Sequence, residues 1–127
     1  MANWTPDGFA AKLFALTARY IPPPEGLPPP VLWGDEATVR QRFGTGVSSL
    51  RMERRPFTMT FPFPPRDTVR FFREYFGPTR VAYSRLDEAA QAAYTKELEQ
   101  LWEQRNQSKD GTTYVPNEYL EIVATRA

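Results

Sequence analysis

The chain has 127 residues, 41% of them hydrophobic, and its 16 basic and 15 acidic residues leave a net charge of +1. This length predicts one domain, residues 1–127, with room for a core of its own. The charge excludes a polyelectrolyte type of nucleic-acid binder. The sequence contains neither cysteine nor histidine, which excludes disulfides, thiolate or imidazole catalysis and the metal sites that these residues build.

The N-terminal sequence lacks the basic and apolar regions of a secretory signal. No apolar run approaches the ~20 residues that span a bilayer. We therefore expect a soluble, cytoplasmic chain that binds neither a membrane nor nucleic acid.

The first predicted element is a helix that ends near Tyr20. Thr5 has the side chain of a helix cap, Pro6 suits a first helical position, and Asp7 favours the positive end of the helix dipole. Apolar residues then recur at helical spacing. Six prolines among residues 22–30 predict an extended loop that is internal to the domain.

A short second helix follows over residues 36–43, with Asp35 as its cap and Gly44 as its stop. Residues 47–63 then predict a strand, because apolar side chains alternate with threonines around Met59. The alternation changes phase at residues 54–56, which predicts either a bulge or a sheet edge there.

Three more helices are expected over residues 66–76, 79–86 and 88–107. Asp110 and Gly111 predict a turn, and the chain ends in a strand over residues 119–126. This strand has apolar side chains on both faces, which is typical of a strand buried on both sides. The fold class is thus about five helices plus two antiparallel strands, α+β as a free chain. Two strands make a marginal sheet with open edges, so we expect a self-dimer or strand exchange.

Four segments carry a family resemblance, in the same order along the chain: ANWTPDGF (2–9), VLWGDEATVRQRFG (31–44), FFREYFGPT (71–79) and DGTTYVPNEYLEIVATR (110–126). They resemble the C-terminal half of class I S-adenosylmethionine-dependent methyltransferases of the type 11 small-molecule group. The resemblance implies the C-terminal portion of a Rossmann-like α/β fold with a seven-stranded sheet. Residues 2–4 would end the fifth strand and residues 57–61 would form the sixth. Residues 119–125 would be the seventh strand, which runs antiparallel between the other two.

The half of that family's domain that binds the cofactor has no counterpart in this sequence. In the family, a glycine-rich turn holds the methionine part of S-adenosylmethionine, and an acidic residue holds its ribose hydroxyls. The nearest glycine pair, Gly44 and Gly46, lies between a predicted helix and a predicted strand, so we expect a helix stop and a turn there. The resemblance implies S-adenosylmethionine as the cofactor of a complete protein, without cofactor-binding residues in this chain.

Five residues are candidates for contacts with a small-molecule acceptor: Trp4, Thr5, Phe9, Trp33 and Tyr75. The first three stand where the fifth strand would meet the next helix, at the edge where open α/β sheets bind ligands. They could equally be a helix cap and two core aromatics. Trp33 could line a lid or hold a loop against the core, and Tyr75 belongs either to the acceptor site or to the core.

No pattern in the sequence predicts a catalytic acid, base or nucleophile, or a metal site. Methyl transfer depends mainly on the alignment of two reactants, so this is compatible with the family chemistry. Two hypotheses remain. The first is the acceptor-side part of a methyltransferase, inactive until a companion chain or a longer frame supplies the cofactor-binding half. The second is a non-enzymatic module that binds a small ligand or a partner protein.

Overall fold

The computed structural model describes residues 3–127. This part of the chain forms five α-helices, a 3-10 helix and two strands: α1 (Phe9–Tyr20), η1 (Pro30–Gly34), α2 (Glu36–Phe43), β1 (Val47–Phe61), α3 (Pro65–Tyr75), α4 (Gly77–Arg85), α5 (Glu88–Arg105) and β2 (Thr113–Arg126). The predicted α+β class, with five helices and one antiparallel strand pair, is confirmed. Among the described residues, no helix is long and apolar enough to cross a membrane.

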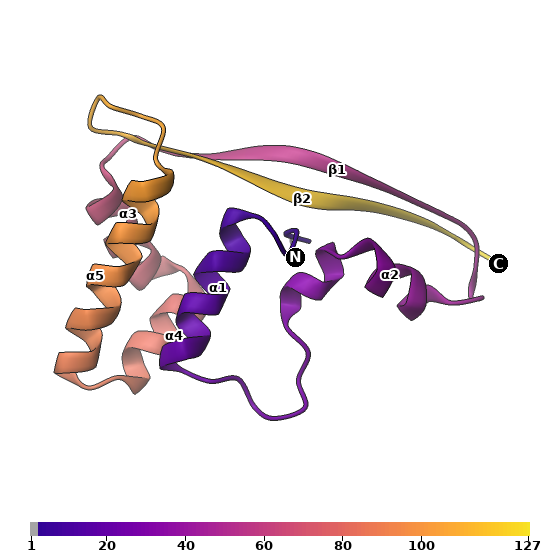
Figure 1. Ribbon diagram of the computed structural model, residues 1–127, viewed down its shortest axis with the longest axis horizontal. Helices are drawn as coiled ribbons and strands as arrows, with labels where there is room; N and C mark the ends of the chain where they lie inside the picture. The colour runs from indigo at the N-terminus through magenta and orange to yellow at the C-terminus, as the bar shows by residue number, and fades with distance from the viewer. Residues whose placement is uncertain (1–2) are drawn as a thin grey trace.

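β1 and β2 form one long antiparallel ribbon that spans the molecule (Figure 1). Their register is continuous from Ser49, opposite Thr125, to Phe61, opposite Thr113, and its irregularity lies between Val47 and Ser49. The bulge considered for residues 54–56 is therefore not formed. The other prediction for these residues, a sheet edge, is confirmed, because in the described sheet β1 pairs with β2 alone and is an edge strand.

β2 has a second neighbour, the short segment Asn3–Thr5. Trp4 forms an antiparallel bridge with Tyr119. The Leu120 amide donates to the Asn3 carbonyl oxygen at 2.8 Å, and the Thr5 amide donates to the Glu118 carbonyl oxygen at 3.1 Å. β2 thus lies between Asn3–Thr5 and β1, and these two outer segments run in the same direction. Ala2, expected in the same strand as Asn3, lies outside the described residues.

The ribbon buries one face near the start of β2 and the opposite face near the middle of β2. Near its start β2 buries Val115 and Asn117, whereas further along it buries Leu120, which points to the other face. The register does not shift between these positions, so the change of face comes from the twist of the ribbon, which is large in two-stranded sheets. Figure 1 shows the main helical bundle under one end of the ribbon and α2 under the other.

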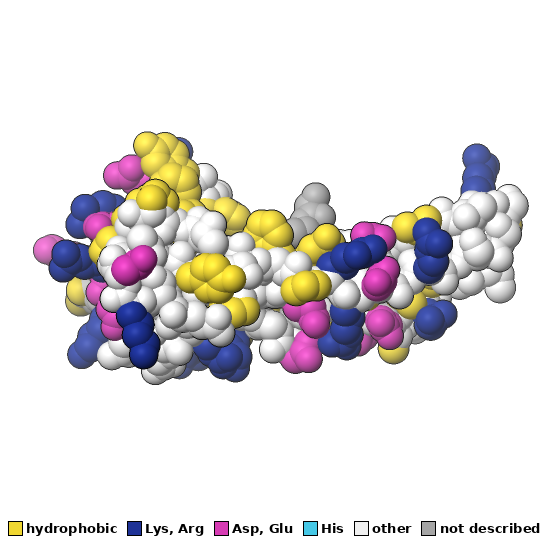
Figure 2. Space-filling model, turned by 90° about the horizontal axis from the view of Figure 1, so that it is seen from above, with side chains coloured by type: hydrophobic (Ala, Val, Ile, Leu, Met, Phe, Trp, Pro, Cys, Tyr) yellow, Lys and Arg dark blue, Asp and Glu magenta, His cyan; other side chains and the backbone are white. Residues whose placement is uncertain are grey.

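Residues 123–126, at the C-terminal end of β2, are exposed. The expectation that the final strand is buried on both faces is therefore wrong for this end. The reason is that α1, α3, α4 and α5 cover only the other half of the ribbon (Figure 1). Charged pairs occupy one face in the middle of the ribbon: Arg55 Nε lies 3.0 Å from Glu121 Oε2, and Arg55 Nη2 lies 3.1 Å from Glu53 Oε2. Acidic and basic side chains stand beside one another there when the molecule is seen from above (Figure 2).

The hydrophobic core lies between the helical bundle and the first half of the ribbon, and α5 supplies its two largest buried side chains. The ring of Trp102 meets that of Phe9 at 4.7 Å, and Tyr94 packs against Tyr20 at 5.0 Å. The Tyr94 hydroxyl lies 2.7 Å from Thr17 Oγ1. Burial raises the pKa of Tyr94, with the Thr17 hydrogen bond acting in the opposite direction, so this phenol remains a neutral structural group.

The first helix begins later than the sequence predicts. α1 starts at Phe9, and its N-cap, Gly8, has no side-chain hydrogen bond. Thr5 is not the cap, because its buried hydroxyl donates to the Glu118 carbonyl oxygen at 3.4 Å. The helix start is held from the sheet instead: the Ala10 amide donates to Asn117 Oδ1 at 3.4 Å.

Most of the proline-rich segment, residues 22–29, is an exposed loop with a turn at Gly26, where φ is +85°. It returns the chain to η1, whose last residue, Gly34, is packed against the Asn3–Thr5 strand. A Cβ added to Gly34 would lie 2.0 Å from the Trp4 carbonyl oxygen and 2.9 Å from Thr5 Cα. Only glycine permits this backbone contact.

We predict that Gly34→Ala destabilises the fold by about 1–3 kcal/mol, the usual cost of forcing extra atoms into a packed site. Urea unfolding followed by far-UV circular dichroism measures the change. Gly77→Ala is the matched control, because a Cβ at Gly77 meets nothing within 4 Å and alanine favours the helix. Equal stability of the two variants would show that the Gly34 contact with Trp4 is not a constraint.

Candidate functional site

A cavity of about 130 Å³, here named the apolar cavity, lies between the helical bundle and the sheet. Its lining is aliphatic and aromatic apart from the hydroxyl groups of Thr17 and Thr79. Trp4, Leu13, Met59, Phe72, Phe76 and Trp102 are among the residues that line it. It is therefore bounded by the Asn3–Thr5 strand, by β1 and by the helical bundle together.

Helical periodicity places these side chains. Ala10, Leu13 and Thr17 recur on one face of α1 at spacings of three and four residues, and all three line the apolar cavity. Phe72 and Phe76 repeat the same spacing from α3 to the residue that follows it. The same helical spacing of apolar residues that predicts a core-facing side therefore also places the side chains that line this cavity.

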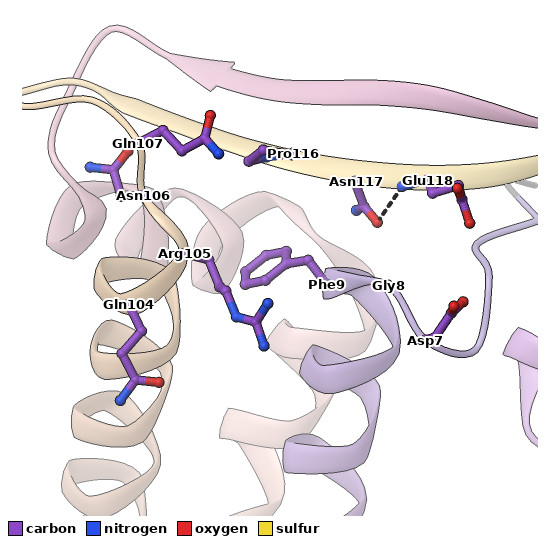
Figure 3. A pocket seen from close by; sticks show the side chains of 10 residues that line it. All are labelled: Asp7, Gly8, Phe9, Gln104, Arg105, Asn106, Gln107, Pro116, Asn117 and Glu118. Atoms are coloured by element: carbon purple, nitrogen blue, oxygen red, sulfur yellow. Dashed lines mark hydrogen bonds between the residues drawn. The ribbon is translucent and has the colours of Figure 1, made fainter.

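A second concavity, here named the polar groove, lies at the junction of α1, α5 and β2 (Figure 3). Its volume is about 540 Å³ and it is open to solvent. Figure 3 shows Arg105 reaching from the end of α5 toward Phe9, with Asn117 and Glu118 on β2 above them and Asp7 at the far side. The groove thus brings two carboxylates, those of Asp7 and Glu118, and the guanidinium of Arg105 to the region around the start of α1.

The two carboxylates of the polar groove share one cation. Arg54 Nη1 lies 3.2 Å from Glu118 Oε1 and 3.6 Å from Asp7 Oδ2. Asp7 and then Glu118 raise the pKa of the Arg54 guanidinium. Carboxylates that are paired with the same fixed charge suit a structural role better than proton transfer, so the groove is a weak candidate for acid–base chemistry.

The structure separates the five predicted acceptor contacts. Trp4 lines the apolar cavity, and its ring lies 6.0 Å from Phe57 and 6.5 Å from Tyr119. Thr5 is fully buried, and Phe9 is packed on Trp102 and borders the polar groove. Trp4, Thr5 and Phe9 are therefore brought together at one junction, but only Trp4 faces the apolar cavity.

The other two predicted contacts lie away from this junction. Trp33 in η1 is 38% exposed, and its ring carries the guanidinium of Arg42 at 4.4 Å. Tyr75 at the end of α3 is 72% exposed and touches Phe71 at 5.0 Å between ring centres. Neither lines the apolar cavity, and acceptor-binding roles for all five residues stay predictions.

The glycines between α2 and β1 do not form a cofactor cradle of the family's kind. Gly44 and Gly46 join the end of α2 to β1, and Gly44 has a φ of +54°. This is the helix stop and turn expected from the sequence, with a helix before the glycines and a strand after them. Within residues 3–127, no three or more Asp or Glu side chains cluster as metal ligands.

Sequence reasoning missed two kinds of site residue. Met59, Leu98 and Trp102 follow core periodicities, and nothing in the sequence distinguishes a cavity wall from a filled core. Asn117 does carry a signal in the sequence, because it is a lone amide between Val115 and Leu120 on the buried stretch of β2. A buried polar residue among apolar neighbours usually makes a specific hydrogen bond, and here it holds the start of α1.

Comparison with known proteins finds relatives but no named family. Two proteins of Mycobacterium tuberculosis (strains CDC 1551 and H37Rv) and one of Mycobacterium bovis, each described as uncharacterized, are 33% identical to this chain over 98 residues. The match covers 76% of this chain but only 36% of each relative. This chain thus corresponds to part of longer proteins. No family model matches it, and no solved structure matches it significantly.

We predict that Asn117→Ala lowers the free energy of unfolding by about 1–2 kcal/mol, as the loss of a helix-capping acceptor does. Asn117→Asp is the matched control, because it keeps an oxygen acceptor beside the positive end of α1. Thermal and urea unfolding of both variants measure the difference. If Asn117→Asp loses as much stability as Asn117→Ala, the hydrogen bond to Ala10 is not what the side chain contributes.

Proposed function

We propose that this chain is the acceptor-side part of an S-adenosylmethionine-dependent class I methyltransferase. The observation that carries the proposal is the order of three extended segments: Asn3–Thr5, which joins β2 through the bridge at Trp4, then β2, then β1. The two outer strands run in the same direction and the middle strand runs against them. This is the order that the family resemblance implies for the fifth, seventh and sixth strands of the seven-stranded sheet.

The composition of β1 supports the same assignment. β1 carries Pro56 in its interior, and charged residues Glu53, Arg54 and Arg55 beside it. Proline and charge in a strand are typical of an edge, because they discourage further pairing. β1 therefore suits the outermost strand of a larger sheet, whose other strands would lie beyond Asn3–Thr5.

The lengths of the relatives are compatible with this arrangement. Since the match covers 36% of each relative, a protein of that length has room for a cofactor-binding unit in addition to the part seen here. In this chain the cofactor-binding glycine turn has no counterpart, so the proposed methyl donor would be held by residues of that unit. A companion chain or a second copy of this chain would be alternative partners at the uncovered sheet.

A second candidate function is a non-enzymatic small-ligand or interaction module. The observation that favours it is that the apolar cavity is lined by residues of this chain alone, so a ligand could be held there without any cofactor. The two functions differ in one respect that can be measured, the requirement for S-adenosylmethionine.

Calorimetric titration with S-adenosylmethionine and its demethylated product tests the proposal on two proteins. The Mycobacterium tuberculosis relative in full length is expected to bind one equivalent of either compound, and this chain alone is expected to bind neither at low micromolar affinity. Adenosine triphosphate serves as the control ligand, since an unspecific nucleotide site would take it as well.

Two results would count against the proposal, in different ways. Low-micromolar binding of S-adenosylmethionine to this chain alone would mean that the cofactor cradle is not missing. A full-length relative that binds no S-adenosylmethionine would remove the methyltransferase assignment and leave the binding module.

A further inference from the structure

The apolar cavity excludes charged ligands. None of its lining side chains is ionisable, and the hydroxyl of Thr17 is already engaged, donating to the Leu13 carbonyl oxygen at 3.0 Å and lying 2.7 Å from the Tyr94 hydroxyl. A carboxylate or an ammonium group would lose its hydration there and find no opposite charge, which carries a large energetic cost. A ligand of this cavity is therefore neutral and has at most one or two polar atoms.

The size of the cavity restricts the ligand to about one ring. Its volume is about 130 Å³, which is similar to the roughly 150 Å³ of engineered apolar cavities that take up benzene and stay free of water. Two fused rings would need displacement of the walls. The expected ligand is a single ring with short apolar substituents.

The wall geometry suits an aromatic or alicyclic ring. The Phe72 and Trp102 rings are 5.3 Å apart and inclined by 66°, and Phe72 meets Phe76 at 5.2 Å. Rings inclined in this way offer edges and faces, the contacts that a third ring prefers. Met59 on the sheet side adds a flexible thioether that adapts to the ligand's outline.

Two aromatic side chains mark where the cavity reaches the surface. Phe76, in the extended link between α3 and α4, is 40% exposed. Trp4 lines both the apolar cavity and an open hollow that it shares with Phe57 and Tyr119. The Trp4 side adjoins the strand Asn3–Thr5, beyond which the proposed function places the methyl donor.

We propose that the apolar cavity binds a small neutral compound with a single apolar ring, and that this ring belongs to the methyl acceptor. The second statement rests on the function proposed above, whereas the first rests on the cavity alone. Binding can therefore be measured on this chain without any cofactor.

Toluene, benzoate and benzylammonium are suitable probes, because they share one ring and differ in charge. Methyl-labelled protein is titrated with each and followed by nuclear magnetic resonance. Toluene is expected to shift the methyl signals of Leu13, Met59 and Val69, which line the cavity. It should leave those of Leu27 and Val123, which are exposed elsewhere, unchanged. Benzoate and benzylammonium are expected to bind at least tenfold more weakly than toluene.

A cavity-filling variant tests the location by a second route. Ala10 lines the cavity and is buried, so Ala10→Leu occupies part of its volume and is expected to lower toluene affinity at least tenfold. Ala93→Leu, the same change at an exposed position of α5, is expected to bind toluene as the unaltered chain does. If Ala10→Leu does not fold, the methyl map of the unaltered chain decides alone.

The proposal is overturned if a charged probe binds as tightly as toluene, if folded Ala10→Leu binds toluene normally, or if the shifted methyls lie outside the cavity. Its failure is distinguishable from failure of the proposed function. Toluene bound in the cavity of a chain whose full-length relative takes no S-adenosylmethionine leaves the ligand site standing and removes the acceptor role. A relative that binds S-adenosylmethionine but methylates only a charged acceptor supports the proposed function and overturns the assignment of the cavity's ring to the methyl acceptor.

Discussion

The structure depends on one short strand, Asn3–Thr5, which is fixed on two sides. On one side its backbone pairs with β2 through Leu120 and Glu118. On the other it packs against Gly34 so closely that no side chain fits between them. These contacts make β2 an inner strand, bring η1 back to the sheet after the proline-rich loop, and set the point from which α1 leaves.

The position of α1 then determines the cavity. Its first turn is held by Asn117 of β2, and its inner face carries Ala10, Leu13 and Thr17 toward α5 and β1. Thr17 meets Tyr94 of α5 at 2.7 Å, which fixes the distance between the two helices at the far end. The apolar cavity is the space left where these helices, α3 and the Trp4 strand cannot all come into contact.

Local signals explain what could be predicted from the sequence. Periodicity and capping residues such as Asp35, which accepts the Thr38 amide, located the helices to within a few residues. The contacts that connect distant segments left weaker signals. Thr5 is a residue type that commonly caps helices, yet its hydroxyl donates a hydrogen bond to the backbone of β2, more than a hundred residues away. The phase change in β1 was visible, but its cause is a twist of the whole ribbon, which no local pattern encodes.

Of the five predicted acceptor contacts, Trp4 alone lines the apolar cavity. The family resemblance placed Trp4 at the end of a strand, although it could equally be a core aromatic, whereas Met59 and Trp102 satisfied a core pattern and gave no reason to look further. Two neighbouring parts of the ribbon surface differ in their need for a partner. In the middle of the ribbon the charges of Glu53, Arg55 and Glu121 satisfy one another in contact with water, so this part is stable when exposed. Around Trp4, Phe57 and Tyr119 the exposed surface is aromatic instead, and burial of that surface is favourable. Because Arg55 is paired with Tyr119 in the register, the charged side chains border the aromatic ones on the same stretch of the ribbon, and the apolar surface left for an additional strand or partner is the one around Trp4.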